Sequence, residues 1–168
     1  MSMHRFVLGS AFVMAAAWMS SAYAAESVRY IAPGRPAVTL DAAALAKLPH
    51  ASAKGATHGD PVSTWEGIAL IDLLREQGVP VDKALRGGAL AKFVRVTASD
   101  GYQVVFSLGE LDPDLGAEKV LLANRRDGHP IDASDGPYRI VVPVDVRAAR
   151  WIRNVTTIEL VDGSTPRQ

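Results

Sequence analysis

The stretch from Asp135 to Trp151 reads DGPYRIVVPVDVRAARW, and the rest of the chain can be interpreted around it. Ile140 to Val142 forms a short apolar strand, which needs burial, with arginines on both sides. A guanidinium is rarely buried unless it pairs with a carboxylate or phosphate, so we expect the arginine side chains at the ends of this strand. This pattern is typical of a binding edge.

The charged and aromatic residues of this stretch allow two interpretations. Either they bind an acidic ligand, or the arginines pair with nearby carboxylates, as most surface ion pairs do. The residues concerned are Arg139, Arg147, Arg150 and Trp151, with Asp135 and Asp145 as the nearby acids.

The first 24 residues have the pattern of a cleaved export signal. A basic start at His4 and Arg5 precedes an apolar run from Phe6 to Trp18, and Ala22-Tyr23-Ala24 is a small-x-small cleavage site. The apolar run is shorter than the roughly 20 residues that span a bilayer. We therefore expect a mature protein that begins near Ala25, is periplasmic, and forms a single domain over residues 25–168.

Charge and cysteine content exclude several classes of function. The chain has 18 basic and 18 acidic residues, so it carries no basic excess for nucleic acid or an anionic membrane. It has no cysteine, which excludes disulfides, a thiolate nucleophile and any Cys-ligated metal or cluster. The sequence also lacks a G-x-S-x-G elbow, a P-loop, a G-x-G-x-x-G and an H-E-x-x-H motif.

Apolar spacing and turn residues predict an α+β fold with a mixed, mainly antiparallel sheet and short helices. Asp100-Gly101 predicts a hairpin, Ser107 with Glu110 a capping box, and Asp127-Gly128 a turn. The strands are expected at 28–31, 38–40, 93–98, 102–107, 120–123, 140–142 and 158–161, and the helices at 42–48 and 68–77.

The segment from Ala51 to Thr64 is polar and aperiodic, and it is long for a connection, so it is a candidate lid over a site. It includes His58. The other histidines after the leader are His50 and His129, and none has the i, i+4 spacing of helical metal ligands. A surface loop explains each of them.

Trp65 and Trp151 lie beside turns or arginines and not inside apolar runs. A flat ring beside guanidiniums suits stacking on a planar ligand whose acidic end the arginines hold. Core filling is the alternative, above all for Trp65. Asp100 and Asp135 precede glycines, where a turn also explains them.

The ordered motifs of the chain resemble the molybdopterin-binding domain of the sulfite oxidase family. Residues 65–74, WEGIALIDLL, are similar to that family's W-x-G-[VI]-x-L-x-D-[LV]-L, and residues 136–143 and 147–152 are similar to segments that line its pterin site. Between them follow Asp100-Gly101-Tyr102, Leu122-Ala123 and residues 127–130, DGHP, in the family's order. The resemblance extends over residues 38–161.

The resemblance implies a retained pterin-binding fold, but catalytic members ligate molybdenum with a Cys upstream of W-x-G, and this chain has none. Some exported relatives without this cysteine act as periplasmic pterin-binding proteins that report to membrane-bound enzymes making or degrading cyclic dinucleotides. For this chain the resemblance implies the same role and makes molybdenum an unexpected ligand. The pterin-binding residues would be Arg139, Arg147, Arg150, Trp151, Trp65, Asp135, Asp100 and His58.

Two alternatives stay open. The domain could be an oxidoreductase that holds molybdenum through the dithiolene of its cofactor, with solvent, Thr57 or His58 in the vacant position. It could also be a ligand-free interaction module, in which the arginines only pair with aspartates and the fold docks onto a membrane-anchored partner.

Overall fold

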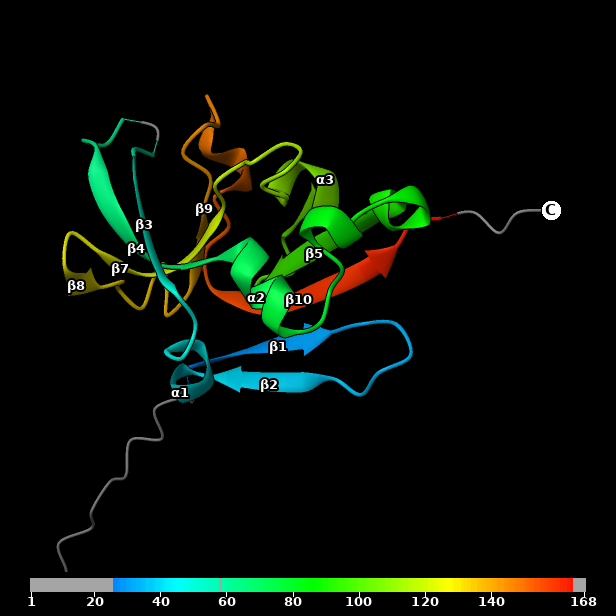
Figure 1. Cartoon of the computed structure of the whole chain (residues 1–168). Coiled ribbons are helices and arrows are strands. Elements are labelled where there is room, and N and C mark those ends of the chain that lie inside the picture. Colours follow the sequence, from blue (N-terminus) through cyan, green and yellow to red (C-terminus); the bar gives the residue numbers. More distant parts are fainter. Residues whose placement is uncertain (1–25, 58, 165–168) are drawn as a thin grey trace, which may run out of the picture.

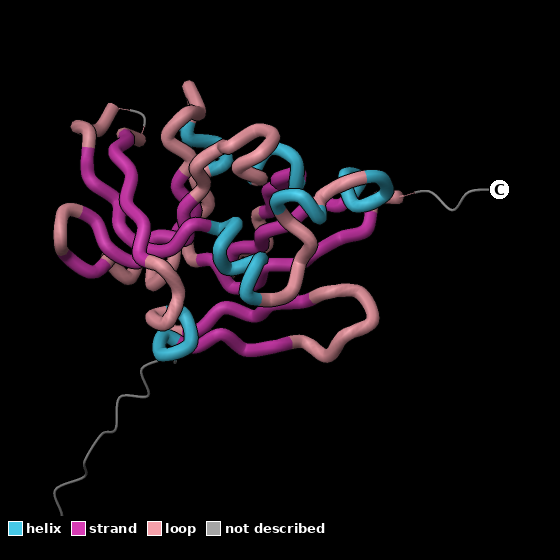
Figure 2. The backbone as a smooth tube through the Cα atoms, in the orientation of Figure 1, coloured by secondary structure: helices cyan, strands magenta, loops and turns pink. Residues whose placement is uncertain are grey.

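A computed structural model describes residues 26–57 and 59–164 (Figures 1 and 2). The predicted export signal and His58 lie outside these residues. No helix in the described part of the chain is long and apolar enough to cross a membrane.

The first of two five-stranded sheets brings together the two ends of the described chain. Its strand order is β2-β1-β10-β5-β6; β1 and β10 are parallel, and the other neighbours are antiparallel. Figure 1 shows β1 and β2 below β10 and β5. The strands are β1 (Ser27–Ile31), β2 (Val38–Asp41), β5 (Lys92–Ala98), β6 (Gln103–Ser107) and β10 (Val155–Asp162).

The second sheet has the order β3-β4-β7-β8, and β9 also pairs with β7, all antiparallel. Strand β9 lies within the stretch from Asp135 to Trp151, and all three of its residues are buried. The strands are β3 (His50–Gly55), β4 (Ser63–Ala69), β7 (Leu121–Arg126), β8 (His129–Pro130) and β9 (Arg139–Val141). The fold is therefore the predicted α+β class with mixed, mainly antiparallel sheets.

The helices are short, and local side chains fix where two of them begin. Asp41 accepts a hydrogen bond from the backbone N–H of Ala44, and Ser107 forms the predicted capping box with Glu110. The α-helices are α1 (Ala42–Leu45), α2 (Leu70–Glu76) and α3 (Leu108–Leu111); the 3₁₀ helices are η1 (Asp82–Ala84), η2 (Gly87–Ala91) and η3 (Ala148–Arg150).

The prediction of an aperiodic connection from Ala51 to Thr64 is wrong, because most of this segment belongs to the β3–β4 hairpin. Strand β3 alternates between exposed and half-buried residues, and its inward positions are Ala51, Ala53 and Gly55. Such small residues give no apolar alternation that would reveal a strand in the sequence. Only residues 56–62 connect the two strands.

Both predicted helices were too long. Helix α1 ends at Leu45, three residues before the expected end, and α2 begins at Leu70. Ile68 belongs to β4, where it pairs with Leu122 of β7. Helix α2 follows β4 without a loop, and the apolar spacing of the helix continues into the strand. The sequence therefore does not show where the strand ends and the helix begins.

Candidate functional site

Arg139 lies in the interior, against the ring of Trp65. It is only 6% exposed, its Nη1 donates to Asp135 Oδ2 at 2.5 Å, and its guanidinium lies 5.2 Å from the Trp65 ring centroid. Burial lowers the pKa of Arg139, and the charge of Asp135 opposes this effect. Its buried Nε makes no hydrogen bond within the described structure. Asp135 also accepts from Arg153, so the pairing interpretation holds for Arg139.

Both tryptophans are core residues. Trp65 is 1% and Trp151 4% exposed, and their rings meet edge to face at 5.9 Å. Each indole N–H donates to a backbone carbonyl, that of Gly55 for Trp65 and that of Val142 for Trp151. Both rings therefore fill the core, which was the alternative interpretation from the sequence, and a stacking role for either ring stays a prediction.

Arg150 is surrounded by three carboxylates. It donates to Asp145 at 2.6 and 3.0 Å, to Glu110 at 2.8 Å and to Glu118 at 2.8 Å. The hydrogen bonds to Asp145, ahead of those to Glu110, raise the pKa of Arg150 above its ordinary value. The predicted salt bridge to Asp145 is confirmed, and the two glutamates were not foreseen. These contacts engage all three guanidinium nitrogens.

Of the remaining predicted site residues, Asp100 lines an open pocket of about 330 Å³ together with Trp151, and Arg147 does not line it. Arg147 is exposed, directly before η3, and makes no ion pair with any described residue. Asp100 accepts from the backbone N–H of Tyr102 and so acts as a turn residue. His50 and His129 are exposed strand residues. The described residues include no group of three or more acids and histidines placed to hold a metal ion.

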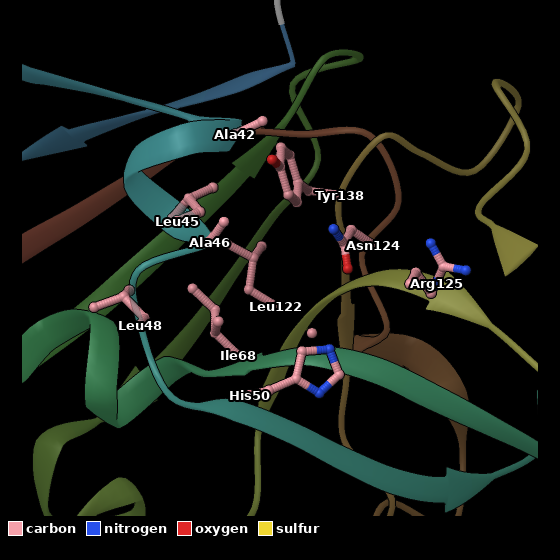
Figure 3. A pocket seen from close by; sticks show the side chains of 11 residues that line it. Ala42, Leu45, Ala46, Leu48, His50, Ile68, Leu122, Asn124, Arg125 and Tyr138 are labelled. Carbon is pink, nitrogen blue, oxygen red and sulfur yellow. The ribbon is translucent and has the colours of Figure 1, made fainter. Parts of the chain in front are cut away.

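An open pocket that the sequence analysis missed lies between α1 and the second sheet. We call it the Tyr138 pocket; its volume is about 180 Å³. Figure 3 shows Leu45 and Leu48 on one side, with Tyr138, Asn124 and His50 facing them. It is lined by Ala42, Leu45, Ala46, Leu48, His50, Gly67, Ile68, Leu122, Asn124, Arg125 and Tyr138.

The Tyr138 pocket escaped sequence analysis because its lining comes from separate elements. Tyr138 and Arg139 are neighbours, and side chains next to each other in extended chain point to opposite faces. The arginine therefore packs on Trp65 while the tyrosine ring, 3% exposed, lines the pocket. Burial raises the pKa of Tyr138, and Glu26 and Asp41 add to the rise, so its hydroxyl stays protonated near neutral pH.

This arrangement is the fold of a sulfite-oxidase-type molybdopterin-binding domain. Residues 43–168 match the family described as the oxidoreductase molybdopterin binding domain, and the chain belongs to that family. Among solved structures it resembles the sulfane dehydrogenase SoxCD from Paracoccus pantotrophus, with a TM-score of 0.61 and 14% identity over 81% of this chain. The match spans 38% of the SoxCD chain. The comparison with curated proteins gave no match.

The residues present do not fit the thiolate-ligated molybdenum centre that the family resemblance implies. No cysteine exists anywhere in the chain to supply the thiolate. Thr57, which the sequence suggested as a replacement for the missing ligand, donates a hydrogen bond from its hydroxyl to Asp60. The arginines of the resemblance, Arg139 and Arg150, are held by carboxylates of the protein itself.

Proposed function

We propose that this protein is a periplasmic pterin-binding protein that uses a molybdopterin-binding fold for recognition and not for redox turnover. In this proposal it reports the bound pterin to a membrane-anchored enzyme that makes or degrades cyclic dinucleotides. The observation that carries the proposal is a family fold over residues 43–168 in a chain with no cysteine. A fold that lacks the metal-ligating residue can keep its binding function while it loses the chemistry of the metal.

The signalling part of the proposal rests on the sequence. The leader-like residues 1–24 support export, and the near-neutral charge gives no support for nucleic acid as a partner. The resemblance to exported relatives without the cysteine supports a membrane-anchored signalling partner.

Ligand binding is tested with purified protein titrated into fluorescent pterins, in oxidised and dihydro forms. A ligand that prefers the folded state stabilises it, by about 2.7 kcal/mol when its free concentration is 100 times its Kd. We therefore expect saturable quenching at one pterin per chain and a rise in the unfolding temperature. If no pterin is bound, the proposal is wrong.

Metal content separates this function from the oxidoreductase alternative. The protein is produced in a host that makes the molybdenum cofactor, and molybdenum per chain is measured by elemental analysis. We expect far less than one molybdenum per chain. A stoichiometric amount would support the oxidoreductase and contradict the proposal.

A ligand-free interaction module is a second candidate, and the ion pairs of Arg139 and Arg150 favour it. In that case the arginines serve only the fold, and pterins leave the unfolding temperature unchanged. The titration above therefore also decides between these two functions.

A further inference from the structure

Another open pocket lies at the end of the first sheet where β1 and β10 both end (Figure 1). The β1–β2 turn, the segment after α2 and the adjoining ends of β5 and β10 surround it, and its volume is about 220 Å³. We call it the Tyr30 pocket, and we propose that it binds the carboxylate of a small organic acid. The lining residues that carry this proposal are Tyr30, Arg35, Val79, Pro80, Lys92 and Leu160.

The Tyr30 pocket and the pocket beside Trp151 lie at opposite ends of β5. Lys92, the first residue of this strand, lines the Tyr30 pocket, and Ala98, the last, lines the other. A strand of 7 residues extends over about 20 Å. The two pockets are therefore separate, and the inference does not depend on whether the protein binds a pterin.

The hydroxyl of Tyr30 is a buried donor without a partner. Tyr30 is 3% exposed, and its hydroxyl makes no hydrogen bond within the described structure. Folded proteins pair nearly all of their buried polar groups, so an unpaired hydroxyl on the wall of a pocket indicates a ligand that accepts from it. Burial raises the pKa of Tyr30, and the charge of Arg35 opposes this rise. The hydroxyl therefore keeps its proton near neutral pH and can donate a hydrogen bond to an anionic oxygen.

Lys92 belongs to the buried face of the first sheet. Side chains alternate between the two faces of a strand, and Val94 and Val96, on the same face of β5 as Lys92, are buried. A lysine therefore continues the row of core residues at the point where the Tyr30 pocket begins. Its Nζ lies 3.7 Å from Asp162 Oδ2, which is beyond hydrogen-bond distance, so its N–H donors can serve a ligand.

Arg35 supplies a second cation from the β1–β2 turn. Its Nη1 donates to the backbone carbonyl of Gln77 at 3.0 Å, which holds the guanidinium at the end of α2. A guanidinium has five N–H donors, so others remain for a ligand. No Asp or Glu side chain lines the pocket, and the formal charge stays positive when Asp162 beside Lys92 is counted. The polar part of the lining therefore favours an anion.

The apolar part of the lining favours an organic anion. Val79, Pro80 and Leu160 line the same pocket, so a hydrocarbon group bound there is removed from water. A planar carboxylate can accept two parallel hydrogen bonds from a guanidinium. The volume of about 220 Å³ lies below the roughly 300 Å³ at which pockets for drug-sized ligands begin. A carboxylate on a short chain or a single ring matches both the chemistry and the size.

Benzoate and benzamide are the matched probes, because they have nearly the same shape and differ in charge. Purified ¹⁵N-labelled protein is titrated with each, and with inorganic phosphate, at constant ionic strength. We expect saturable benzoate binding that shifts the amide resonances of Gly78 and Val79, and no comparable effect of benzamide. The proposal is wrong if benzoate does not bind or if benzamide binds equally well. Binding of phosphate without benzoate would also overturn it, since the ligand would not be a carboxylate.

Tyr30→Phe is the decisive variant, because it removes the unpaired hydroxyl and keeps the buried ring. It should weaken benzoate binding about tenfold, as the loss of a hydrogen bond to a charged group does. Without benzoate its unfolding temperature should be unchanged or raised, because no hydrogen bond of the described structure is lost. A large fall would show that the hydroxyl serves the fold and would contradict its assignment to a ligand.

Lys92→Gln tests the charge of the pocket independently of the core. It should also weaken benzoate binding about tenfold, since a charge-assisted hydrogen bond is lost. Arg29→Gln, at an exposed cation between the buried Val28 and Tyr30 of β1, is the matched control and should leave the affinity unchanged. If Tyr30→Phe and Lys92→Gln bind benzoate as the wild type does, the ligand lies elsewhere and the proposal fails. Circular dichroism of each variant confirms that it is folded.

Discussion

Arg139 is a buried cation whose carboxylate partner belongs to the same stretch of chain. Its guanidinium is buried with a single carboxylate partner, Asp135, on a chain segment four residues away. Removing one partner of a buried pair leaves an uncompensated charge, which costs more than the pair itself contributes. The pair therefore matters for the fold whether or not a ligand binds nearby.

Asp135→Asn should lower the free energy of unfolding by about 3 kcal/mol, because the buried Arg139 loses its charged partner. Urea denaturation followed by circular dichroism measures this change. Asp132→Asn is the control, since Asp132 is exposed and its side chain makes no hydrogen bond or ion pair with the described residues, and its effect should stay within about 0.5 kcal/mol. Equal effects of the two substitutions would contradict the role assigned to Asp135.

Arg150 marks the limit of what local sequence can reveal. The pair with Asp145, five residues away, could be predicted as an alternative, but Glu118 and Glu110 lie 32 and 40 residues away. No periodicity connects positions so distant in the chain. The same holds for the burial of Trp151, whose indole contacts are created by tertiary packing.

At the scale of elements, turn and capping signals predicted the structure well. The Asp100-Gly101 hairpin, the Ser107 capping box and the buried strand β9 were all predicted, because each is encoded within a few residues. Strand β3 was missed because its inward positions are alanine and glycine. The Tyr138 pocket was missed because α1, β3, β4 and β7 all contribute to it.

Strands β4 and β7 are paired in the second sheet, and Gly67 of β4 lies so close to the β7 backbone that it has no room for a side chain. A Cβ there would lie 2.2 Å from the Leu122 carbonyl oxygen and 2.7 Å from the Ala123 Cα, both backbone atoms. Gly67→Ala should therefore destabilise the domain by about 3 kcal/mol or prevent folding, since the strands must separate. Thermal denaturation and expression yield report the effect.

Gly88→Ala is the matched control for Gly67→Ala. A Cβ at Gly88 would meet no atom within 4 Å, and its backbone conformation is open to other residues. Its unfolding temperature should be unchanged or slightly raised, because alanine restricts the unfolded chain. If Gly88→Ala lowered the unfolding temperature strongly, glycine would be needed there for a reason other than close packing.

The capping box at the start of α3 is a second test at this scale. Ser107→Ala removes the acceptor for the Glu110 N–H, so the free energy of unfolding should fall by about 1 kcal/mol. Ser99→Ala, at an exposed residue outside any helix cap, should have little effect. Chemical denaturation of both variants gives the comparison.

At the scale of the whole molecule, the expected export makes a prediction of its own. Produced with its full sequence in a bacterium with a periplasm, the protein should appear in the periplasmic fraction with Ala25 as its first residue, because Ala22-Tyr23-Ala24 fits a signal peptidase site. Intact-mass analysis of the fractionated protein checks the cleavage position. A cytoplasmic protein of full mass would contradict the interpretation of the leader.

The parallel pairing of β1 with β10 has a consequence for how the protein is made. Strand β1 starts at Ser27, and β10 ends at Asp162, so β10 cannot take its place in the first sheet until residues 27–162 have all been synthesised. Contacts between such distant segments close slowly, because the loop entropy must be overcome first. The strand order that joins the two ends of the domain therefore makes completion of the first sheet a late step in folding.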